Sequence, residues 1–325
     1  KRKEVPDFSE INGQQFVKRA CEIAVSGRHN LLMIGPPGAG KTMIARRIPG
    51  ILPEMTEEEA LEVTKIYSVR GLLTESEAWM AERPFRNPHH TITPQGLAGG
   101  GMVPGPGEIS LAHHGVLFLD ELAEFRRETL EILRQPMEEH CVKLARLAGN
   151  YEFPSDFMLV AAMNPCRCGY YPDLNRCHCT KGMVEQYLKK ISQPLLDRID
   201  ICVETKRVEY QDLIKENPHQ VTSAEIRKRV VAAMERQQQR FAGTNIRYNS
   251  RIPAALLTKY CRLSTKQKQY MESIYQKLEL TARSYHRILR VARTIADMDG
   301  SDEILTRHLS EAVCYRNVDK KFWEG

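Results

Sequence analysis

Short apolar runs recur along the first two thirds of the chain. They lie at 31–34, 116–119 and 157–163, and a fourth ends the stretch 193–203. Continuous apolar runs of this length are typical of strands buried on both faces of a sheet. Residues 10–30 instead place Phe16, Ala20, Ile23 and Ala24 on one face, which predicts a helix that ends at Gly27. The pattern predicts an α/β fold.

The last third of the chain has a helical pattern throughout. Helices are predicted over 223–241, 253–261, 266–278, 284–299 and 306–315. Ser223 is the expected cap of the first, without a capping box, because Ile226 stands where a Glu or Gln would be needed. Residues 205–222 have the composition of a domain junction. We therefore expect an α/β domain over about 1–210 and an all-helical domain over 211–325.

Two segments within the α/β part have a different character. Residues 84–110 carry proline and glycine too often for a regular helix or a central strand, which predicts an irregular insert. Residues 141–153 alternate apolar and polar around Gly149-Asn150 and predict a β-hairpin. The helix expected over 127–138 is disturbed near Pro136.

Two histidine pairs, His89-His90 and His113-His114, invite a metal-site interpretation. Adjacent side chains on an extended backbone point to opposite sides, so each pair is expected to be a poor chelate. Polar loop positions or polynucleotide contacts are the preferred interpretation.

Composition places the chain among globular proteins, with 42% hydrophobic and 27% charged residues in 325. No apolar run approaches the length that spans a bilayer, and no signal-peptide pattern begins the sequence, so a cytoplasmic protein is expected. Of the net charge of +6, residues 1–220 contribute −3 and residues 221–325 contribute +9. This basic C-terminal part suits a nucleic-acid partner, although a solvated helical surface explains it almost as well.

A glycine-rich loop follows the first predicted strand and precedes a helix. The sequence Gly35-Pro36-Pro37-Gly38-Ala39-Gly40-Lys41-Thr42 fits the phosphate-binding pattern G-x-x-x-x-G-K-[ST] at every fixed position. Such a loop directs backbone N–H groups and a helix N-terminus at phosphates. We expect Gly35 to Met43 to bind ATP, with Lys41 at the β- and γ-phosphates and the Thr42 hydroxyl on Mg²⁺. The alternative is a chance glycine turn before a helix.

Polar residues follow two of the other apolar runs. Asp120 and Glu121 come directly after 116–119, where Asp120 would orient Mg²⁺ and Glu121 would polarise the attacking water. Asn164 follows 157–163, where its amide would hold the water or the γ-phosphate. The alternatives are a strand that ends in solvent and an Asn that caps a turn.

Four cysteines then cluster as C-x-C-x₈-C-x-C, at Cys166, Cys168, Cys177 and Cys179. In a cytosolic chain this favours thiolate–metal bonds over disulfides, and four sulfurs favour a closed tetrahedral Zn²⁺ site. His178 is an alternative to one thiolate. The site would stabilise the loop rather than perform chemistry. The other five cysteines are expected to be reduced core residues.

Taken together, these motifs resemble the AAA+ ATPases. Within that superfamily, the chain closely resembles the magnesium-chelatase-like YifB/ComM family. The specific motifs are Arg86-x-Pro88-His89-His90-Thr91, Gly99-Gly100-Gly101, the stretch Pro106-Gly107-Glu108-Ile109-Ser110-Leu111-Ala112-His113, and Asn164-Pro165-Cys166. The resemblance covers nearly the whole chain and implies a three-layer α/β/α domain with a parallel sheet, followed by a helical lid. Members generally carry an additional N-terminal domain, and Arg167 stands here where they have proline in the cysteine loop.

The resemblance also implies roles for single residues. Asn164 is the sensor-1 residue, Arg198 the arginine finger offered to an adjacent protomer, and Arg283 the sensor-2 arginine of the lid. Residues 84–110 are the helix-2 insert and 141–153 the pre-sensor-1 hairpin, on which Arg146 is the candidate DNA contact. Without the resemblance, Arg198 between two aspartates is most often a local ion pair.

The activity implied is that of an ATP-driven motor. It would form a homo-oligomeric, hexameric ring on DNA, like the branch-migration helicases of natural transformation, with ATP, Mg²⁺ and a structural Zn²⁺. One alternative is a magnesium-chelatase-like chaperone that remodels a protein partner, and another is a nucleotide-gated switch with little turnover.

Overall fold

The computed structural model describes residues 5–73, 79–146, 149–207 and 220–323. A five-stranded parallel sheet has the strand order β2-β5-β8-β1-β9. Its strands are β1 (Leu31–Ile34), β2 (Phe85–Arg86), β5 (Val116–Leu119), β8 (Met158–Met163) and β9 (Ile201–Glu204). The sheet confirms the predicted α/β fold. Within the described residues we find no helix long and apolar enough to cross a bilayer.

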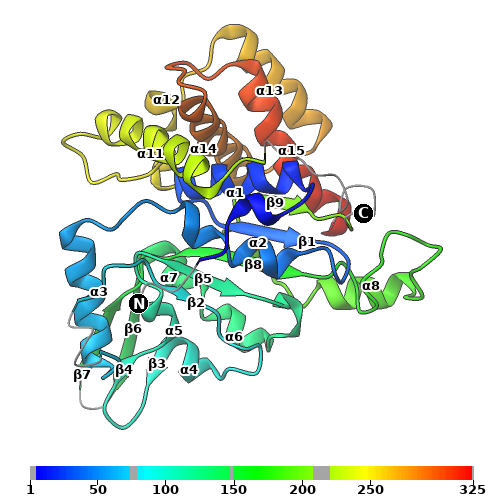
Figure 1. Ribbon diagram of the computed structural model, residues 1–325. Coiled ribbons are helices and arrows are strands. Elements are labelled where there is room, and N and C mark those ends of the chain that lie inside the picture. Colours follow the sequence, from blue (N-terminus) through cyan, green and yellow to red (C-terminus); the bar gives the residue numbers. More distant parts are fainter. Residues whose placement is uncertain (1–4, 74–78, 147–148, 208–219, 324–325) are drawn as a thin grey trace. The chain divides into compact units, whose positions relative to one another are not determined.

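The described chain forms two compact units (Figure 1). Unit 1 comprises the described residues within 1–34, 38–51 and 199–325, and unit 2 comprises the described residues within 35–37 and 52–198. The domain boundary expected near residue 210 lies outside the described residues.

Unit 1 holds the predicted N-terminal helix and all the C-terminal helices. Its strands pair in parallel with Leu31 opposite Ile201. On the predicted face of the N-terminal helix, Ala20, Ile23 and Ala24 are buried, whereas Phe16 is 46% exposed and stacks on the ring of Tyr315. Its helices are η1 (Phe8–Glu10), α1 (Gln15–Gly27), α2 (Lys41–Ala45), η2 (Ile48–Ile51), α11 (Ser223–Arg240), η4 (Asn249–Arg251), η5 (Ala254–Leu256), α12 (Leu257–Tyr260), α13 (Thr265–Lys277), α14 (Ala282–Met298) and α15 (Thr306–Trp323).

The start of α11 differs by one residue from the prediction. Thr222, not Ser223, is the N-cap, and Glu225 completes a capping box with it. Ser223 instead accepts a hydrogen bond from the backbone N–H of Phe8 at 2.8 Å. On α14, Arg287 is buried and donates to the carbonyl of Ile199.

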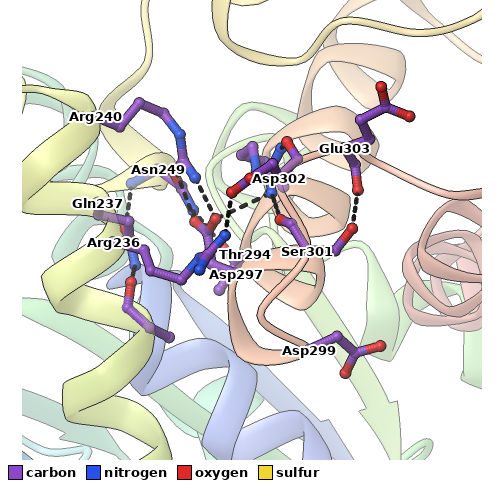
Figure 2. A network of polar contacts seen from close by, with 12 residues as sticks. Arg236, Gln237, Arg240, Asn249, Thr294, Asp297, Asp299, Ser301, Asp302 and Glu303 are labelled. Carbon is purple, nitrogen blue, oxygen red and sulfur yellow. Dashed lines mark hydrogen bonds and ion pairs between the residues drawn. The ribbon is translucent and has the colours of Figure 1, made fainter.

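A buried carboxylate organises the polar centre of unit 1 (Figure 2). The Asp297 side chain is fully buried on α14 and accepts hydrogen bonds from Arg240 Nη1 at 2.7 Å and Asn249 Nδ2 at 2.8 Å. Arg293, one turn earlier on α14, lies 3.1 Å from the same carboxylate. A buried charge is tolerated only when it is paired and hydrogen-bonded, and these three donors meet that requirement. Their contacts with Asp297 connect α11, η4 and α14.

Unit 2 contains the other three strands of the sheet, with Phe85 opposite Val116 and Val116 opposite Met158. The helix predicted over 127–138 is broken at Ile132-Leu133 rather than at Pro136, which lies in the first turn of α7 where proline is tolerated. Its helices are α3 (Glu57–Val69), α4 (Pro94–Ala98), α5 (Glu108–Leu111), η3 (Leu122–Glu124), α6 (Arg127–Glu131), α7 (Arg134–Glu139), α8 (Lys181–Leu188) and α9 (Gln193–Leu196).

The predicted insert and the predicted hairpin of unit 2 both contain regular secondary structure. The insert contains α4, α5 and a two-stranded ribbon, β3 (Gly99–Gly100) and β4 (Gly105–Pro106). The predicted hairpin is formed by β6 (Cys141–Arg146) and β7 (Gly149–Pro154). Its turn was misplaced, because Gly149 pairs with Arg146 and Asn150 with Ala145 inside the ladder. The two residues between the strands, 147 and 148, lie outside the described residues.

Candidate functional site

The glycine-rich loop adopts the backbone conformation that its glycines were predicted to allow. Gly38 and Gly40 have φ angles of 75° and 78°, a region that residues with a side chain rarely adopt. A Cβ atom at either position would meet no atom within 4 Å, so backbone conformation rather than packing requires glycine there. Helix α2 begins directly at Lys41, which is 9% exposed. Strand, loop and helix therefore follow one another as expected for an anion-binding turn.

The first residue of this loop is hydrogen-bonded within unit 2. Gly35 N–H donates to the carbonyl of Met163, the last residue of β8, at 3.2 Å. Asn164 is the next residue along the chain. This bond fixes the beginning of the loop at the strand end from which Asn164 emerges.

Asp120 and Glu121 lie at the end of β5, as predicted. The Asp120 carboxylate accepts a hydrogen bond from Glu121 N–H at 2.9 Å. Glu121 has a φ angle of 52°, which is uncommon for a residue with a side chain, and 59% of its side chain is exposed. The chain thus turns sharply after β5 and presents an accessible carboxylate.

His90 contacts this carboxylate. Its Nδ1 atom lies 3.1 Å from Glu121 Oε2. The His90 ring packs edge-on against Phe125, which follows the turn, and lies 4.1 Å from the ring of His89. Sequence reasoning noted the histidine pair without assigning it to this site. The parallel pairing of β2 with β5 brings the two segments together.

The four cysteines converge as predicted. The Sγ atoms of Cys166, Cys168 and Cys177 are separated by 3.3, 3.5 and 3.7 Å, and that of Cys179 lies within 4.8 Å of the others. A tetrahedron of thiolates bonded to zinc at about 2.3 Å has edges of about 3.8 Å. The donor set and its spacing therefore fit a Zn²⁺ ion.

Among the four cysteines, the surroundings of Cys168 favour its thiolate, whereas the pKa values of Cys177 and Cys179 are raised, that of Cys177 mainly by burial. Although burial opposes the thiolate, hydrogen bonds from the backbone N–H groups of Tyr170 and His178 lower the pKa of Cys168 to about 6. The N–H of Tyr171 lies 3.4 Å from Cys166 Sγ.

Among the remaining cysteines, four are buried as expected, but Cys314 is exposed, so that prediction was wrong for it.

The cysteine loop packs on the glycine-rich loop. A Cβ atom added at Gly169 would lie 2.5 Å from Cδ of Pro37. Gly169 also has a φ angle of 86°. Only glycine permits this approach, so the cysteine loop supports one side of the first half of the phosphate-binding motif.

The second histidine pair also converges on a carboxylate. His114 has a φ angle of 55°, which brings its ring within 3.8 Å of the His113 ring. The expectation that such pairs diverge was wrong, because it assumed an extended backbone. Both Nε2 atoms lie within 3 Å of Oε2 of Glu62, at 2.9 Å for His113 and 2.8 Å for His114.

The hydrogen bonds of this pair disfavour a metal. Asp156 N–H donates to His113 Nδ1 at 2.9 Å, so the proton of the neutral ring is on Nε2 and points to Glu62. Burial and the neighbouring His114 lower the pKa of His113 to about 4, which keeps the ring neutral. A protonated Nε2 cannot bind a metal, so the two buried histidines and the half-exposed Glu62 form a hydrogen-bonded anchor between α3 and the segment that precedes β5.

The three arginines predicted to act have different local environments. Arg198 forms an ion pair with Glu138 and donates to the carbonyl of Pro194 at 2.5 Å, and 16% of its side chain is exposed. Arg283 is exposed in the first turn of α14, after the N-cap Thr281. Arg146 is the last residue of β6, at the end of the hairpin.

Sequence comparison gives consistent matches over most of the chain. The profile of the family described as magnesium chelatase, subunit ChlI, matches residues 7–213. The profile described as magnesium chelatase, subunit ChlI C-terminal, matches residues 220–316.

Three similar proteins show how far the similarity extends. The chain is 44% identical over 314 residues to the uncharacterized protein YifB of Escherichia coli, covering 97% of this chain and 61% of YifB. It is 43% identical over 310 residues to competence protein ComM of Haemophilus influenzae, covering 95% of this chain and 60% of ComM. Identity to the uncharacterized protein Rv2897c of Mycobacterium tuberculosis is 37% over 313 residues, or 96% and 62% of the two chains. The chain thus spans about three fifths of the length of these relatives.

Proposed function

Because this chain belongs to the magnesium chelatase ChlI-like family of AAA+ ATPases, we propose that it hydrolyses ATP as a ring-shaped motor acting on DNA. The observation that carries the proposal is the turn at Gly38 and Gly40, whose open, left-handed backbone leads directly into α2. Such a turn binds phosphate through N–H groups and a helix N-terminus. The proposed nucleotide-binding domain comprises residues 1–210 and the proposed lid residues 211–325.

In this proposal, each chemical role falls to a named side chain. Residues 35–43 bind the nucleotide, Lys41 contacts the β- and γ-phosphates, and Thr42 and Asp120 hold Mg²⁺. When bound, Mg²⁺ would neutralise charge that develops on the phosphate oxygens. Glu121 polarises the water for in-line attack, and Asn164 holds that water or the γ-phosphate.

Assembly would complete the site. Arg198 of one protomer is proposed to reach the γ-phosphate bound by its neighbour, and Arg283 is proposed to be the sensor-2 arginine of the lid. Both guanidiniums would stabilise charge in the transition state, so an isolated protomer should hydrolyse ATP slowly. A homohexameric ring is the proposed assembly.

DNA is the proposed substrate, in the manner of a branch-migration helicase. Similarity to a competence protein and the +9 charge of residues 221–325 support this choice. Arg146, at the end of the hairpin, is the candidate contact to the DNA backbone.

The deciding experiment is ATP turnover with and without single-stranded or forked DNA, at several salt concentrations. We expect DNA to stimulate turnover, and we expect its affinity to fall steeply with salt as backbone contacts release counterions. Arg146→Ala should reduce that salt slope, whereas unstimulated turnover and a flat salt dependence would reject DNA as the substrate.

Two other functions give different results in the same assay. A magnesium-chelatase-like chaperone that remodels a protein partner would show hydrolysis stimulated by that partner and not by DNA. A nucleotide-gated switch would bind ATP tightly without multiple turnovers.

We also propose that Cys166, Cys168, Cys177 and Cys179 hold a structural Zn²⁺ ion, which would stabilise the loop that packs on Pro37. Metal content measured by atomic spectroscopy should be close to one zinc per chain. Cys177→Ser should lower it, and an unchanged zinc content in that variant would remove Cys177 from the ligand set.

A further inference from the structure

We propose that unit 1 contains a binding site for a small organic anion, a molecule with an apolar body and one carboxylate or sulfonate group. The site is a cavity of about 390 Å³ lined by residues of η5, α12, the start of α13 and the first half of α14 (Figure 1). Pockets that hold small molecules have volumes of about 300–1,000 Å³ and combine apolar walls with a few polar groups. The described residues that line this cavity include none of those proposed to bind ATP, so the site is independent of the function proposed above.

The interior of the cavity is apolar. Leu257 of α12, Cys261 and Leu289 of α14 line it and are each at most 4% exposed. Burial raises the pKa of the Cys261 thiol to about 12, so this side chain is uncharged near neutral pH. Tyr285 and His286, half-buried on the preceding turn of α14, add two rings whose centroids lie 6.0 Å apart. Such a lining favours a hydrocarbon chain or an aromatic ring over a bare inorganic ion.

The exposed edge of the cavity is positively charged. Arg262 and Lys268 line it, and among the described residues their side chains form no hydrogen bond or ion pair. No Asp or Glu belongs to the described lining. A guanidinium donates two parallel hydrogen bonds to a carboxylate, and an ammonium supplies a second cation beside it. One anionic group on the ligand would therefore complement both side chains.

The sequence around the cavity strengthens this electrostatic preference. Residues 236–271 include eight lysines and arginines, residues 282–296 include four arginines, and neither stretch contains an Asp or Glu. Part of this charge is neutralised within unit 1, as in the pair of Arg240 with Asp297. The remaining positive field attracts anions to the cavity. The basic C-terminal part thus has a second kind of ligand besides nucleic acid.

The first test measures binding of anilinonaphthalene sulfonate, an aromatic monoanion whose fluorescence rises in apolar surroundings, to the whole chain. Octanoate should displace this probe at concentrations about tenfold lower than octanol, which has the same length without the charge, because a hydrogen bond to a charged group contributes at least that much. Equal displacement by octanoate and octanol would overturn the proposed role of the cations.

Variants of the lining locate the site. Arg262→Ala and Lys268→Ala should each weaken octanoate binding by about 3- to 10-fold, since each removes one charged contact. Ala254→Phe should weaken it at least as much without a change of charge, because Ala254 lines the cavity and a phenyl ring would fill part of it. The matched control is Lys266→Ala, two residues from Lys268 on α13 but outside the lining, which should change the affinity by less than about twofold. Equal losses in Lys266→Ala and Lys268→Ala would overturn the site.

A second measurement detects the bound anion in the unmutated chain. Octanoate should shift the imidazole NMR signals of His286, which are identified by their loss in His286→Gln. The signals of His308 on α15 should stay unchanged, because His308 does not line the cavity and contacts Asp299 instead. Unshifted His286 signals at saturating octanoate would overturn the proposal, whether or not the variants fold.

Two macromolecules present a similar combination of anion and apolar group. Single-stranded DNA carries phosphates beside bases, and an acidic peptide with a phenylalanine carries carboxylates beside a ring. Both are therefore added as competitors of the bound probe. Displacement by either at a lower concentration than octanoate would overturn the assignment to a small molecule.

Discussion

Gly169 of the cysteine loop lies so close to Pro37 of the glycine-rich loop that an added Cβ atom would be 2.5 Å from Pro37 Cδ. Real Cβ atoms do not approach a carbon atom so closely, so one of the two loops must move in any variant that carries a side chain at position 169. The cysteine cluster and the phosphate-binding motif are therefore mechanically coupled, although more than 120 residues separate them in the sequence.

Gly169→Ala should weaken ATP binding. At position 169 the φ angle of 86° would add strain of about 1–2 kcal/mol to the clash of a new side chain with Pro37. If Pro37 shifts to relieve this strain, the affinity for ATP should fall by about 5- to 30-fold. Titration with a fluorescent ATP analogue measures the effect. Gly300→Ala is the control, because Gly300 also has a positive φ of 68° but no atom within 4 Å of an added Cβ. Equal affinity in Gly169→Ala and the unmutated chain would show that the loops move independently.

Arg198→Ala should slow ATP turnover by about 10³- to 10⁵-fold, the loss typical of an arginine finger. Within its own chain Arg198 pairs with Glu138, whose side chain is 62% exposed. Arg198 is only 16% exposed, but because Glu138 lies at the surface the pair should contribute no more than about 1 kcal/mol. Assembly can therefore break it, and Glu138→Gln should keep normal turnover.

Mixing two inactive variants tests whether the finger acts between protomers. Lys41→Ala lacks a nucleotide contact and Arg198→Ala lacks the finger, so mixed rings should regain part of the activity at interfaces that combine two intact groups. Mixtures that remain inactive, or Arg198→Ala with normal turnover, would contradict a role in trans.

Much of the fold could be predicted because the signals are local. Four of the five strands coincide with apolar runs, and the long helices with apolar residues at helical spacing. The cysteine cluster was also visible, because its members lie within 14 residues of one another. Thr222 was missed as a cap because Ser223 beside it is an equally good capping residue, and only Glu225 distinguishes them.

The remaining features depend on the backbone or on distant contacts. Nothing in the sequence shows that His114 and Glu121, which are not glycines, adopt a positive φ. At His114, that conformation places the rings of His113 and His114 beside each other. The contact of His90 with Glu121 requires β2 to pair with β5, and β2 has only two residues, too few to produce a periodic pattern.

Asp297→Ala should destabilise the chain by about 3–5 kcal/mol, because it leaves the guanidiniums of Arg240 and Arg293 without their buried counter-charge. Urea unfolding of unmutated and variant chains measures the difference. Asp302→Ala is the matched control within the same network (Figure 2), since the Asp302 side chain is 95% exposed beside Arg236 and should contribute less than about 1 kcal/mol. Similar losses of unfolding free energy in the two variants would show that burial does not determine how much these ion pairs stabilise the chain.

Stability should fall as the pH is lowered from 7 to 5, in part because of His113. Burial and His114 lower its pKa from 6.5 to about 4, while Glu62 and Asp156 oppose the shift. The unfolded chain therefore binds a proton below pH 6.5 that the folded chain does not bind until about pH 4. This difference costs on the order of 2 kcal/mol between pH 7 and 5. His113→Asn keeps an acceptor for Asp156 N–H but does not titrate. Between pH 7 and 5, the free energy of unfolding of this variant should therefore fall by about 2 kcal/mol less than that of the unmutated chain. Parallel pH profiles for the two chains would contradict a neutral, buried His113.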